Sequence, residues 1–135
     1  MIGRMWKTIC NTRLFLENLI KHISKVVTCF YDEAPPGASF PFAVVSGEYI
    51  TELNQGDNLE FYLEIFADEK AENSTVEMED LASSLRAHLN NAIIAADGCF
   101  SSHIGFENQK NTFESEPDLC HRRQTYTARI FYVGG

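Results

Sequence analysis

The most informative stretch of this chain is FYDEAPPGASFPFAVV, which runs from Phe30 to Val45. Two apolar, strand-like segments are joined here by a linker in which Pro35, Pro36 and Pro41 each fix their own φ. Gly37 is the linker position whose backbone is unrestricted. Because a residue that precedes proline is pushed toward extended geometry, the pattern predicts an ordered, extended crossing between two strands.

The residues before the linker carry a helical pattern. Apolar side chains at helical spacing predict an amphipathic helix from about Lys7 to Lys25. Its apolar stripe consists of Leu16, Leu19, Ile20, Ile23 and Val27. A short strand, about Val26 to Tyr31, is expected to lead from this helix into the linker.

The segment after the linker indicates a β-hairpin. Strands are expected from Phe42 to Thr51 and from Leu59 to Asp68, and Gly56 gives the turn between them access to positive φ. The second of these strands alternates apolar and polar side chains, so one of its faces should be buried and the other wet.

A second helix and two more strands complete the predicted fold. Ser74 and Glu77 form a capping box at the start of the helix, and Gly98 is its expected stop signal. Strands are expected from Cys99 to Phe106 and from Gln124 to Val133. The order α-β-β-β-α-β-β indicates a single α+β domain over residues 1–135, with two helices packed on one face of a mainly antiparallel sheet.

Length and composition fit one globular domain that is made and kept in the cytoplasm. The 135 residues are 44% hydrophobic and include ten phenylalanines, which is enough for a core without disulfides or metal. The sequence has no apolar run of the roughly 18–20 residues that a membrane span needs, and its N-terminus lacks the pattern of a signal peptide. The cysteines are spread without a CxxC pair and are expected to be thiols. They are Cys10, Cys29, Cys99 and Cys120.

The charge of the chain is strongly negative. A net charge of −8 argues against a stand-alone nucleic-acid binder, which needs a basic patch to release counterions from phosphates. The ordinary explanation of such a charge is solubility.

The sequence contains no catalytic or cofactor motif. The G-x-S-x-G, H-E-x-x-H and Walker-type patterns are all missing. The scattered histidines are expected to be surface or half-buried residues: His22, His88, His103 and His121. Cys120 is adjacent to His121, but a zinc site there would lack a recognisable ligand spacing. We therefore expect neither enzymatic activity nor a cofactor or metal.

The linker stretch also fits a longer pattern, Y-D-x-A-P-x-G-x-x-F-P-F/Y-x-V, followed by a hairpin, a helix and a terminal strand. Its motif residues in this chain are Tyr31, Pro35, Pro36, Gly37, Phe40 and Pro41. The pattern resembles the tail-terminator and tail-completion proteins of long-tailed bacteriophages, which are also described as minor tail or head-tail joining proteins. The strand LEFYLEIFAD, the helix from Val76 to Leu89 and the terminal RRQTYTARIFYV take the places of the family's corresponding elements, so the resemblance covers most of the chain.

The resemblance implies a structural protein of a phage or prophage, located in the tail or neck of the virion and assembled in the bacterial cytoplasm. It implies a ring of about six copies that caps the head-proximal end of the tail tube, ends tube polymerisation and provides the surface for head docking. The implied partners are further copies of the chain, the tail tube protein and the head-tail connector protein, with no membrane involved. DNA would pass through without specific binding, since six copies at −8 each carry about −48 and repel phosphates.

Two candidate contact edges of such a ring are turns between predicted elements. One is the hairpin tip, with Glu52 and Asp57. The other is the loop from Asp68 to Thr75, with Glu69 and Glu72.

The third candidate edge departs from the family pattern. The segment from Glu107 to His121 is longer and more acidic than the connection expected there. It is either a mobile surface loop or an arm that orders against a neighbouring subunit through Phe113, Glu114 and Glu116. The basic residues that would receive such an arm are Arg122 and Arg123, because guanidinium groups bind carboxylates in bidentate fashion.

Two other interpretations remain open at the level of sequence. A head-side neck component would share these features. A cytoplasmic ligand-binding or regulatory domain is an alternative of a different class, since an antiparallel sheet with two helices serves many functions and fold alone does not decide between them.

Overall fold

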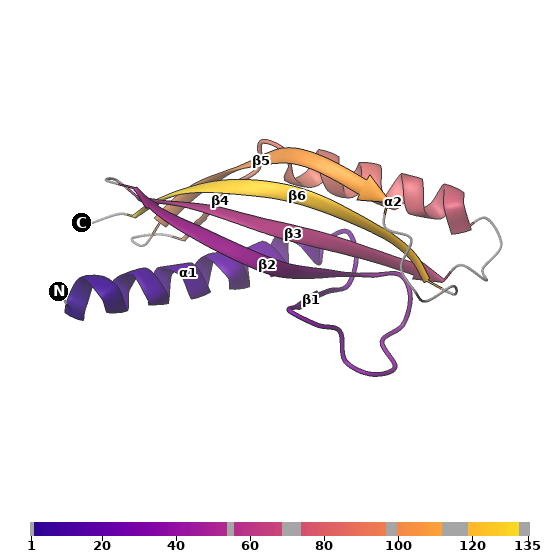
Figure 1. Ribbon diagram of the computed structural model, residues 1–135, viewed down its shortest axis with the longest axis horizontal. Coiled ribbons are helices and arrows are strands. Elements are labelled where there is room, and N and C mark those ends of the chain that lie inside the picture. Colours follow the sequence, from indigo (N-terminus) through magenta and orange to yellow (C-terminus); the bar gives the residue numbers. More distant parts are fainter. Residues whose placement is uncertain (1, 54–55, 69–73, 97–99, 112–118, 133–135) are drawn as a thin grey trace.

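The structure is a computed structural model, and it describes residues 2–53, 56–68, 74–96, 100–111 and 119–132. Helices and strands follow one another along the chain as labelled in Figure 1. Their bounds are α1 Ile2–Ile23, β1 Cys29–Tyr31, β2 Phe42–Leu53, β3 Gly56–Asp68, α2 Ser74–Leu89, β4 Ile93–Ala96, β5 Phe100–Asn111 and β6 Leu119–Tyr132. Neither helix within these ranges has the length and apolar character that crossing a lipid bilayer requires.

The strands form one mixed sheet of six, in the order β1-β2-β3-β6-β5-β4. β1 and β2 run parallel, with Cys29 opposite Ala43. The other neighbouring strands pair antiparallel. The α+β class is therefore confirmed. The parallel pair is the exception to the antiparallel arrangement, because the linker returns the chain to the end of the sheet from which β1 began.

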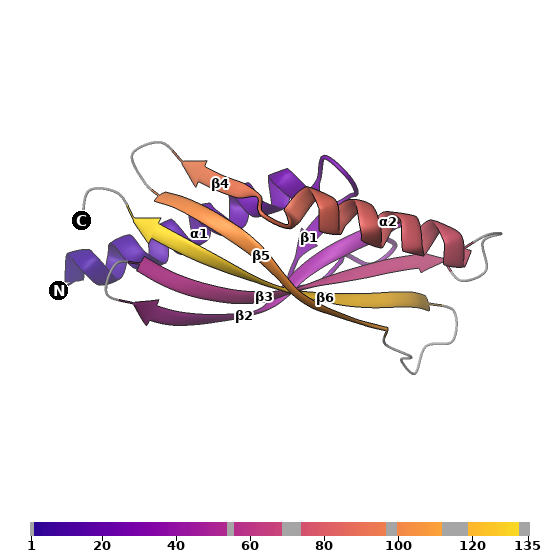
Figure 2. The same cartoon turned by 90° about the horizontal axis from the view of Figure 1, so that it is seen from above.

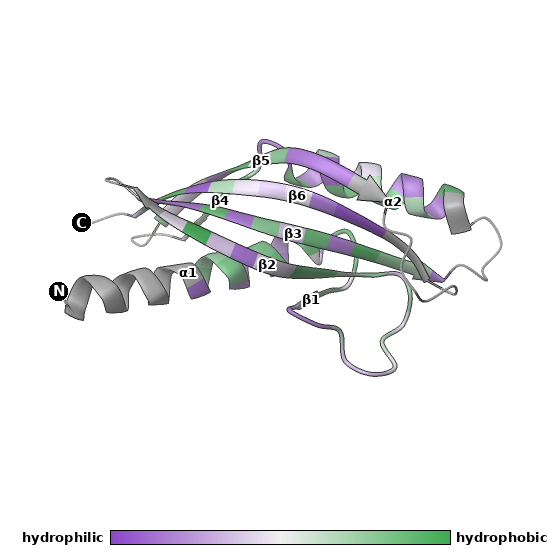
Figure 3. Ribbon diagram, in the orientation of Figure 1, coloured by the Kyte–Doolittle hydropathy of each residue, from purple (hydrophilic) through white to green (hydrophobic). Residues whose placement is uncertain are grey.

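The central strand β3 explains why one face of the sheet is buried. Its inward side chains have no exposed surface: Leu59, Phe61, Leu63 and Ile65. Glu60 and Tyr62 lie on the opposite face, as the two-residue period of a strand requires. The alternating colours along β3 in Figure 3 show this pattern, and the predicted alternation is confirmed.

Both helices supply side chains to one core cluster that lies against the inward face of the sheet (Figure 2). α1 contributes Phe15, Leu19 and Ile23, and α2 contributes Met78, Ala82, Leu85 and Leu89. Burying each large apolar side chain is worth roughly 1.5–3 kcal/mol, whereas a charged pair on a helix surface contributes only about 0.2–0.5 kcal/mol. The helices are therefore held mainly by this shared core.

The chain between α2 and β5 differs from the prediction. α2 ends at Leu89, and Asn91 follows with a φ of 67°, a conformation typical of residues that terminate helices. Ile93–Ala96 then forms the additional strand β4, which pairs with the start of β5. The prediction that Gly98 stops the helix is thus wrong, since the helix has ended and a strand has formed before that position.

The last two strands are longer than the sequence indicated. β5 continues to Asn111 and β6 begins at Leu119, so the segment predicted as a loop from Glu107 onward begins as strand. A bulge between Phe106 and Asn108 shifts the register and allows β5 to continue alongside β6. The connection between these strands comprises residues 112–118, which lie outside the described residues.

Candidate functional site

The linker between β1 and β2 is ordered, but it is not extended throughout. The backbone N–H of Ala38 donates to the carbonyl oxygen of Pro35 at 3.1 Å, which closes a turn around Pro36 and Gly37. Gly37 has a φ of 79°, as the third position of a type II turn requires. The predicted freedom of Gly37 is used here, and the extended crossing gives way to this tight turn.

Aromatic contacts anchor the end of the linker on the sheet face opposite the helices, which we call the outer face. Phe40 stacks on Phe42 with 5.5 Å between the ring centroids, and Phe42 in turn stacks on Phe66 at 5.1 Å. Phe42 is only 8% exposed, whereas Phe40 is 41% exposed. The linker is therefore fixed through Phe42 and presents part of Phe40 to solvent.

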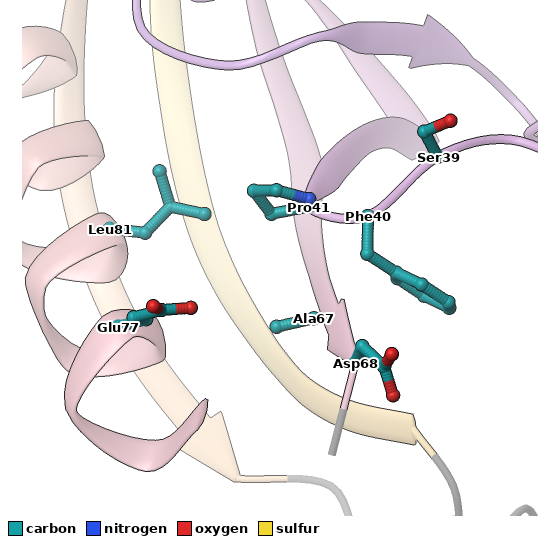
Figure 4. Close-up of a pocket in the computed structure, with 7 residues that line it drawn as sticks. All are labelled: Ser39, Phe40, Pro41, Ala67, Asp68, Glu77 and Leu81. Atoms are coloured by element: carbon teal, nitrogen blue, oxygen red, sulfur yellow. The ribbon is translucent and has the colours of Figure 1, made fainter. Parts of the chain in front are cut away.

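A groove of about 590 Å³ lies between this linker and the first turns of α2 (Figure 4). Its lining residues, which define the linker groove, are Ser39, Phe40, Pro41, Ala67, Asp68, Glu77 and Leu81. The linker forms one wall, α2 forms the other, and the end of β3 lies between them. Both charged side chains of this lining, Asp68 and Glu77, are carboxylates. The linker groove therefore combines apolar surface with negative charge.

The outer face of the sheet carries a second depression, of about 400 Å³. Its lining residues are Asn58, His103, Gly105, Thr127, Arg129 and Phe131, from β3, β5 and β6. The hydroxyl of Thr127 donates to a carboxylate oxygen of Glu107 at 3.0 Å. Since both helices pack on the other face, this surface is a second candidate for contact with a partner.

The described residues form no metal-binding cluster, and two of their groups, Cys29 and Tyr31, have raised pKa values. No group of three His, Cys, Asp or Glu side chains within the described ranges is placed to hold a metal ion. Burial raises the pKa of the Cys29 thiol to about 12, which keeps it protonated and unreactive. The hydrogen bond to Glu48 raises the pKa of Tyr31 to about 12 as well.

Two histidines join the C-terminal ends of the helices. The rings of His22 and His88 stack with 3.9 Å between their centroids. Nε2 of His22 lies 3.0 Å from the carbonyl oxygen of His88, and Nε2 of His88 lies 2.7 Å from that of His22. Because a carbonyl only accepts, each Nε2 carries a proton. The sequence signalled this pair only in that both residues lie in the last turn of a helix.

Acid is expected to weaken the contact between His22 and His88. Burial lowers the pKa of His22 below its ordinary value of 6.5. The hydrogen bond to the His88 carbonyl opposes this shift, and the charges of His88 and Lys25 add smaller contributions that lower the pKa further. Below pH 6.5 the unfolded chain therefore binds more protons at His22 than the folded chain does. The free energy of unfolding should therefore fall as the pH drops below 6.5, and urea unfolding at a series of pH values measures it.

Two variants test the assignment of this pH dependence. His22→Gln should flatten the fall in unfolding free energy, whereas His103→Gln, on the exposed outer face, should retain it. An equally steep fall in the His22→Gln protein would contradict the assignment.

Comparison with known protein families decides the identity of the fold. The family model described as "Tail completion protein gp17" matches residues 20–130. The chain belongs to this family. A search of curated proteins found no match.

A solved structure supports the same fold. A chain from the virion of a native gene transfer agent particle superposes on this tail completion protein with a TM-score of 0.62. The match covers 81% of this chain and 84% of that chain, at 16% sequence identity. At this identity the likeness shows a shared architecture.

Family membership makes this tail completion protein a structural component of the virion, located in the tail or neck. The resemblance that the linker motif indicated is thereby confirmed. Within the motif, Tyr31 ends β1, Pro35, Pro36 and Gly37 lie in the tight turn, and Phe40 and Pro41 line the linker groove.

The structure places few of the predicted contact residues on an open surface. Those outside the described residues are Glu69, Glu72, Phe113, Glu114 and Glu116. Glu52 lies in β2, where its backbone pairs with Asp57. Asp57 is only 3% exposed and accepts a hydrogen bond from the Tyr132 hydroxyl, because it faces inward at the start of β3. In the single subunit Asp57 is therefore covered, and its role as a contact residue stays a prediction.

The two arginines predicted to receive an acidic arm have partners within the subunit. Nη2 of Arg122 lies 2.6 Å from Oε1 of Glu79, and Nη2 of Arg123 lies 2.7 Å from Oε1 of Glu64. The guanidinium of Arg123 also lies over the ring of Tyr62, 4.7 Å from its centroid. An arm from a neighbouring subunit would have to compete with these contacts, so the role of both arginines stays a prediction.

Proposed function

We propose that this tail completion protein closes into a ring of about six copies at the head-proximal end of the tail tube. The observation that carries the proposal is the family match over residues 20–130. A closed ring needs heterologous contacts, in which each subunit uses two different surfaces. The linker groove and the helix-free outer face give the subunit chemically different surfaces for this purpose.

The proposed mechanism is binding alone. One face of the ring is complementary to the last ring of the tail tube. The other face cannot bind further tube protein, so the tube stops growing there. The head-tail connector docks on this second face. The negative charge of the subunit suits a channel for DNA. A ring of about six subunits, each with a net charge of −8, would repel the phosphates of the DNA and not bind them.

Native mass spectrometry over a range of protein concentrations, followed by negative-stain imaging, tests the proposal. We expect a closed ring with a central hole wide enough for duplex DNA. If the isolated protein is monomeric, co-sedimentation with purified tail tubes is the second measurement, because a ring that closes only on the tube tip would still bind there. A monomer that also fails to bind tubes would refute the proposal and favour a head-side neck component.

The loop between β3 and α2 is proposed to contact the tube. Replacing Glu69 and Glu72 with Lys should weaken tube binding by about tenfold or more, because reversed charge at a polar contact costs on the order of 1–3 kcal/mol. Folding should be unaffected, since both residues lie between the two elements rather than within them. Co-sedimentation with tail tubes measures the binding, and circular dichroism verifies the fold.

A matched variant controls for net charge. Glu17→Lys combined with Glu33→Lys makes the same change in charge at two exposed positions far from this loop in sequence, and it should bind tubes normally. Normal tube binding by the Glu69 and Glu72 variant would contradict the proposal that this loop contacts the tube.

A further inference from the structure

We infer that the depression on the outer face of the sheet receives the first two turns of α2 from a neighbouring copy. The depression is lined by Asn58, His103, Gly105, Thr127, Arg129 and Phe131, and we call it the outer depression. The inference rests on the proposed ring, and it names the contact between its subunits. Three observations carry it: an arginine without a carboxylate partner, a glycine that keeps the depression open, and an acidic helix surface at the opposite end of the subunit.

Arg129 lies in the outer depression among side chains that carry no negative charge. Its neighbours on this face are Asn58 and His103 on the adjoining strands. Thr127 and Phe131 are its neighbours two positions away along β6. Among the described residues Arg129 has no ion-pair partner, whereas the other two arginines of β6 each bind a glutamate. The guanidinium of Arg129 is therefore available to a carboxylate from outside the subunit.

Exposed apolar side chains lie next to this arginine. Phe131 is 45% exposed. Ile93 of β4 is 71% exposed, and because it pairs with His103 it lies on the same face of the sheet. Arginine and aromatic residues are enriched at the centres of protein interfaces. This part of the outer face therefore has the composition of a contact surface.

Gly105 keeps the outer depression open. It pairs in register with Thr127, and its φ is not positive, so its backbone does not require a glycine. A Cβ built at Gly105 would lie 3.7 Å from Oγ1 of Thr127, which is an ordinary contact. Glycine weakens a strand, and within one it often marks the close approach of another backbone. The missing side chain therefore indicates that a partner approaches the sheet here.

The start of α2 presents a surface that complements the outer depression. Val76 is 60% exposed, and Asp80 is exposed as well. The two residues are four positions apart, so they lie on the same side of the helix. Among the described residues Asp80 has no ion-pair partner. This side of α2 therefore offers an apolar side chain next to a free carboxylate.

The two surfaces lie too far apart to meet within one subunit. Figures 1 and 2 show the start of α2 at one end of the molecule and the C-terminal end of β6, to which Arg129 belongs, at the other. In addition, α2 packs on the inward face of the sheet, whereas the outer depression lies on the opposite face. Contact between helix and depression therefore joins two copies.

Charge determines which part of the depression the helix contacts. On one side Glu107 accepts a hydrogen bond from the Thr127 hydroxyl at 3.0 Å, so this side carries a carboxylate. Arg129 and His103 lie toward the other side, near the start of β5. Asp80 is therefore directed to Arg129, whose guanidinium can bind a carboxylate in bidentate fashion.

Such a contact is heterologous. Each subunit offers its helix to one neighbour and its depression to the other, so the contacts continue until rotation closes them into a ring. In this arrangement Asp80 faces Arg129. Val76 packs against Phe131, above the open position of Gly105. The charged pair orients the encounter, and the apolar contact supplies affinity.

A reciprocal charge exchange tests the inference. Arg129→Glu alone and Asp80→Arg alone each place like charges in contact. The concentration needed for half assembly should therefore rise by about tenfold or more in each single variant. The chain that carries both substitutions again has opposite charges at every contact, so its assembly should return to that of the unmodified protein. Native mass spectrometry measures assembly, and circular dichroism verifies that each variant folds.

Two matched variants control for charge. Arg13→Glu and Glu17→Arg reverse the same charges at exposed positions of α1, and each should assemble as the unmodified protein does. If both single variants at the contact assemble normally, or if the doubly substituted chain does not recover, the inference is wrong. The proposed ring function then stands, because the unmodified protein still forms its ring.

Gly105→Val fills the outer depression without changing any charge. Valine favours strands and its Cβ has room, so the free energy of unfolding measured in urea should not fall. Assembly should nevertheless weaken by about tenfold or more, because the new side chain occupies the space that the neighbouring helix needs. Normal assembly of a folded Gly105→Val protein would contradict the placement of α2 over this glycine.

Co-sedimentation with purified tail tubes decides the case in which the unmodified protein is monomeric in isolation. Arg129→Glu and Asp80→Arg should each lower the amount bound to tubes, and the doubly substituted chain should recover it. Equal binding by all these proteins overturns the inference and leaves the proposed function intact. An unmodified protein that neither assembles nor binds tubes refutes the proposed function, and the inference with it.

Discussion

Gly56→Ala is expected to destabilise the fold by about 2–6 kcal/mol, which is the sum of backbone strain and steric overlap. Gly56 opens β3 with a φ of 152°, a conformation that residues with a side chain rarely adopt. A Cβ at this position would overlap the carbonyl oxygen of Ile130 in the adjacent strand β6. Since that oxygen belongs to the backbone, it cannot move aside without disturbing the pairing of Asp57 with Ile130. Urea unfolding of the variant measures the loss.

Gly37→Ala is the matched control for this prediction. Gly37 also has positive φ, at 79°, but no atom lies within 4 Å of a Cβ built there. The substitution should therefore carry only the strain of the left-handed conformation, about 1–2 kcal/mol. Equal losses in the two variants would show that the close approach of β6 to Gly56 contributes nothing.

The parts of the fold that the sequence predicted well are those with a local cause. The alternation along β3 depends only on the two-residue period of a strand, and the start of α2 at Ser74 agrees with the predicted capping box. The backbone freedom expected of Gly37 is also used, although in a tight turn and not in the extended crossing that was predicted. Each of these features is encoded within a few residues of where it appears.

β4 escaped prediction because its own residues favour a strand and a helix at the same time. Ile93 and Ile94 favour a strand, but the alanines that follow them and Gly98 together suggested the end of a helix. Pairing with Phe100–His103 of β5 decides in favour of the strand. Pairing also explains the underestimated length of β5, which continues beside β6 beyond the bulge between Phe106 and Asn108.

The candidate site was the least predictable part of the molecule. The linker motif was visible in the sequence, but the groove it forms requires α2, whose residues Glu77 and Leu81 are distant in the chain. The pairing of His22 with His88 spans 66 positions. The spacing of apolar residues in the sequence predicts which side chains are buried. It does not predict which other element of the fold each buried side chain contacts.

A buried hydrogen-bond network links α2 to the sheet behind the linker groove. Gln124 has no exposed surface, and its Nε2 donates to the carbonyl oxygen of Ala82 at 3.0 Å and to Oε1 of Gln109 at 2.8 Å. Its Oε1 accepts a hydrogen bond from the Tyr126 hydroxyl at 2.6 Å. Burial raises the pKa of Tyr126 above its ordinary value, so the phenol keeps its proton and remains a donor.

Gln124→Ala is expected to lower the free energy of unfolding by about 3–5 kcal/mol. The loss combines a cavity in the core with a buried Tyr126 hydroxyl that no longer has its acceptor. Gln109→Ala, at the exposed end of the same network, should cost only about 1 kcal/mol, because water can replace the lost partner there. Chemical denaturation of both variants gives the comparison.

A double substitution separates the polar part of this loss from the packing part. Gln124→Leu fills most of the cavity but leaves the Tyr126 hydroxyl unpaired, which should cost about 1–3 kcal/mol. Adding Tyr126→Phe removes the unpaired group, so the double variant should recover most of that loss. If it does not recover, the network contributes through its hydrogen bond to Ala82. That bond fixes α2 against β6 and so positions the α2 wall of the linker groove.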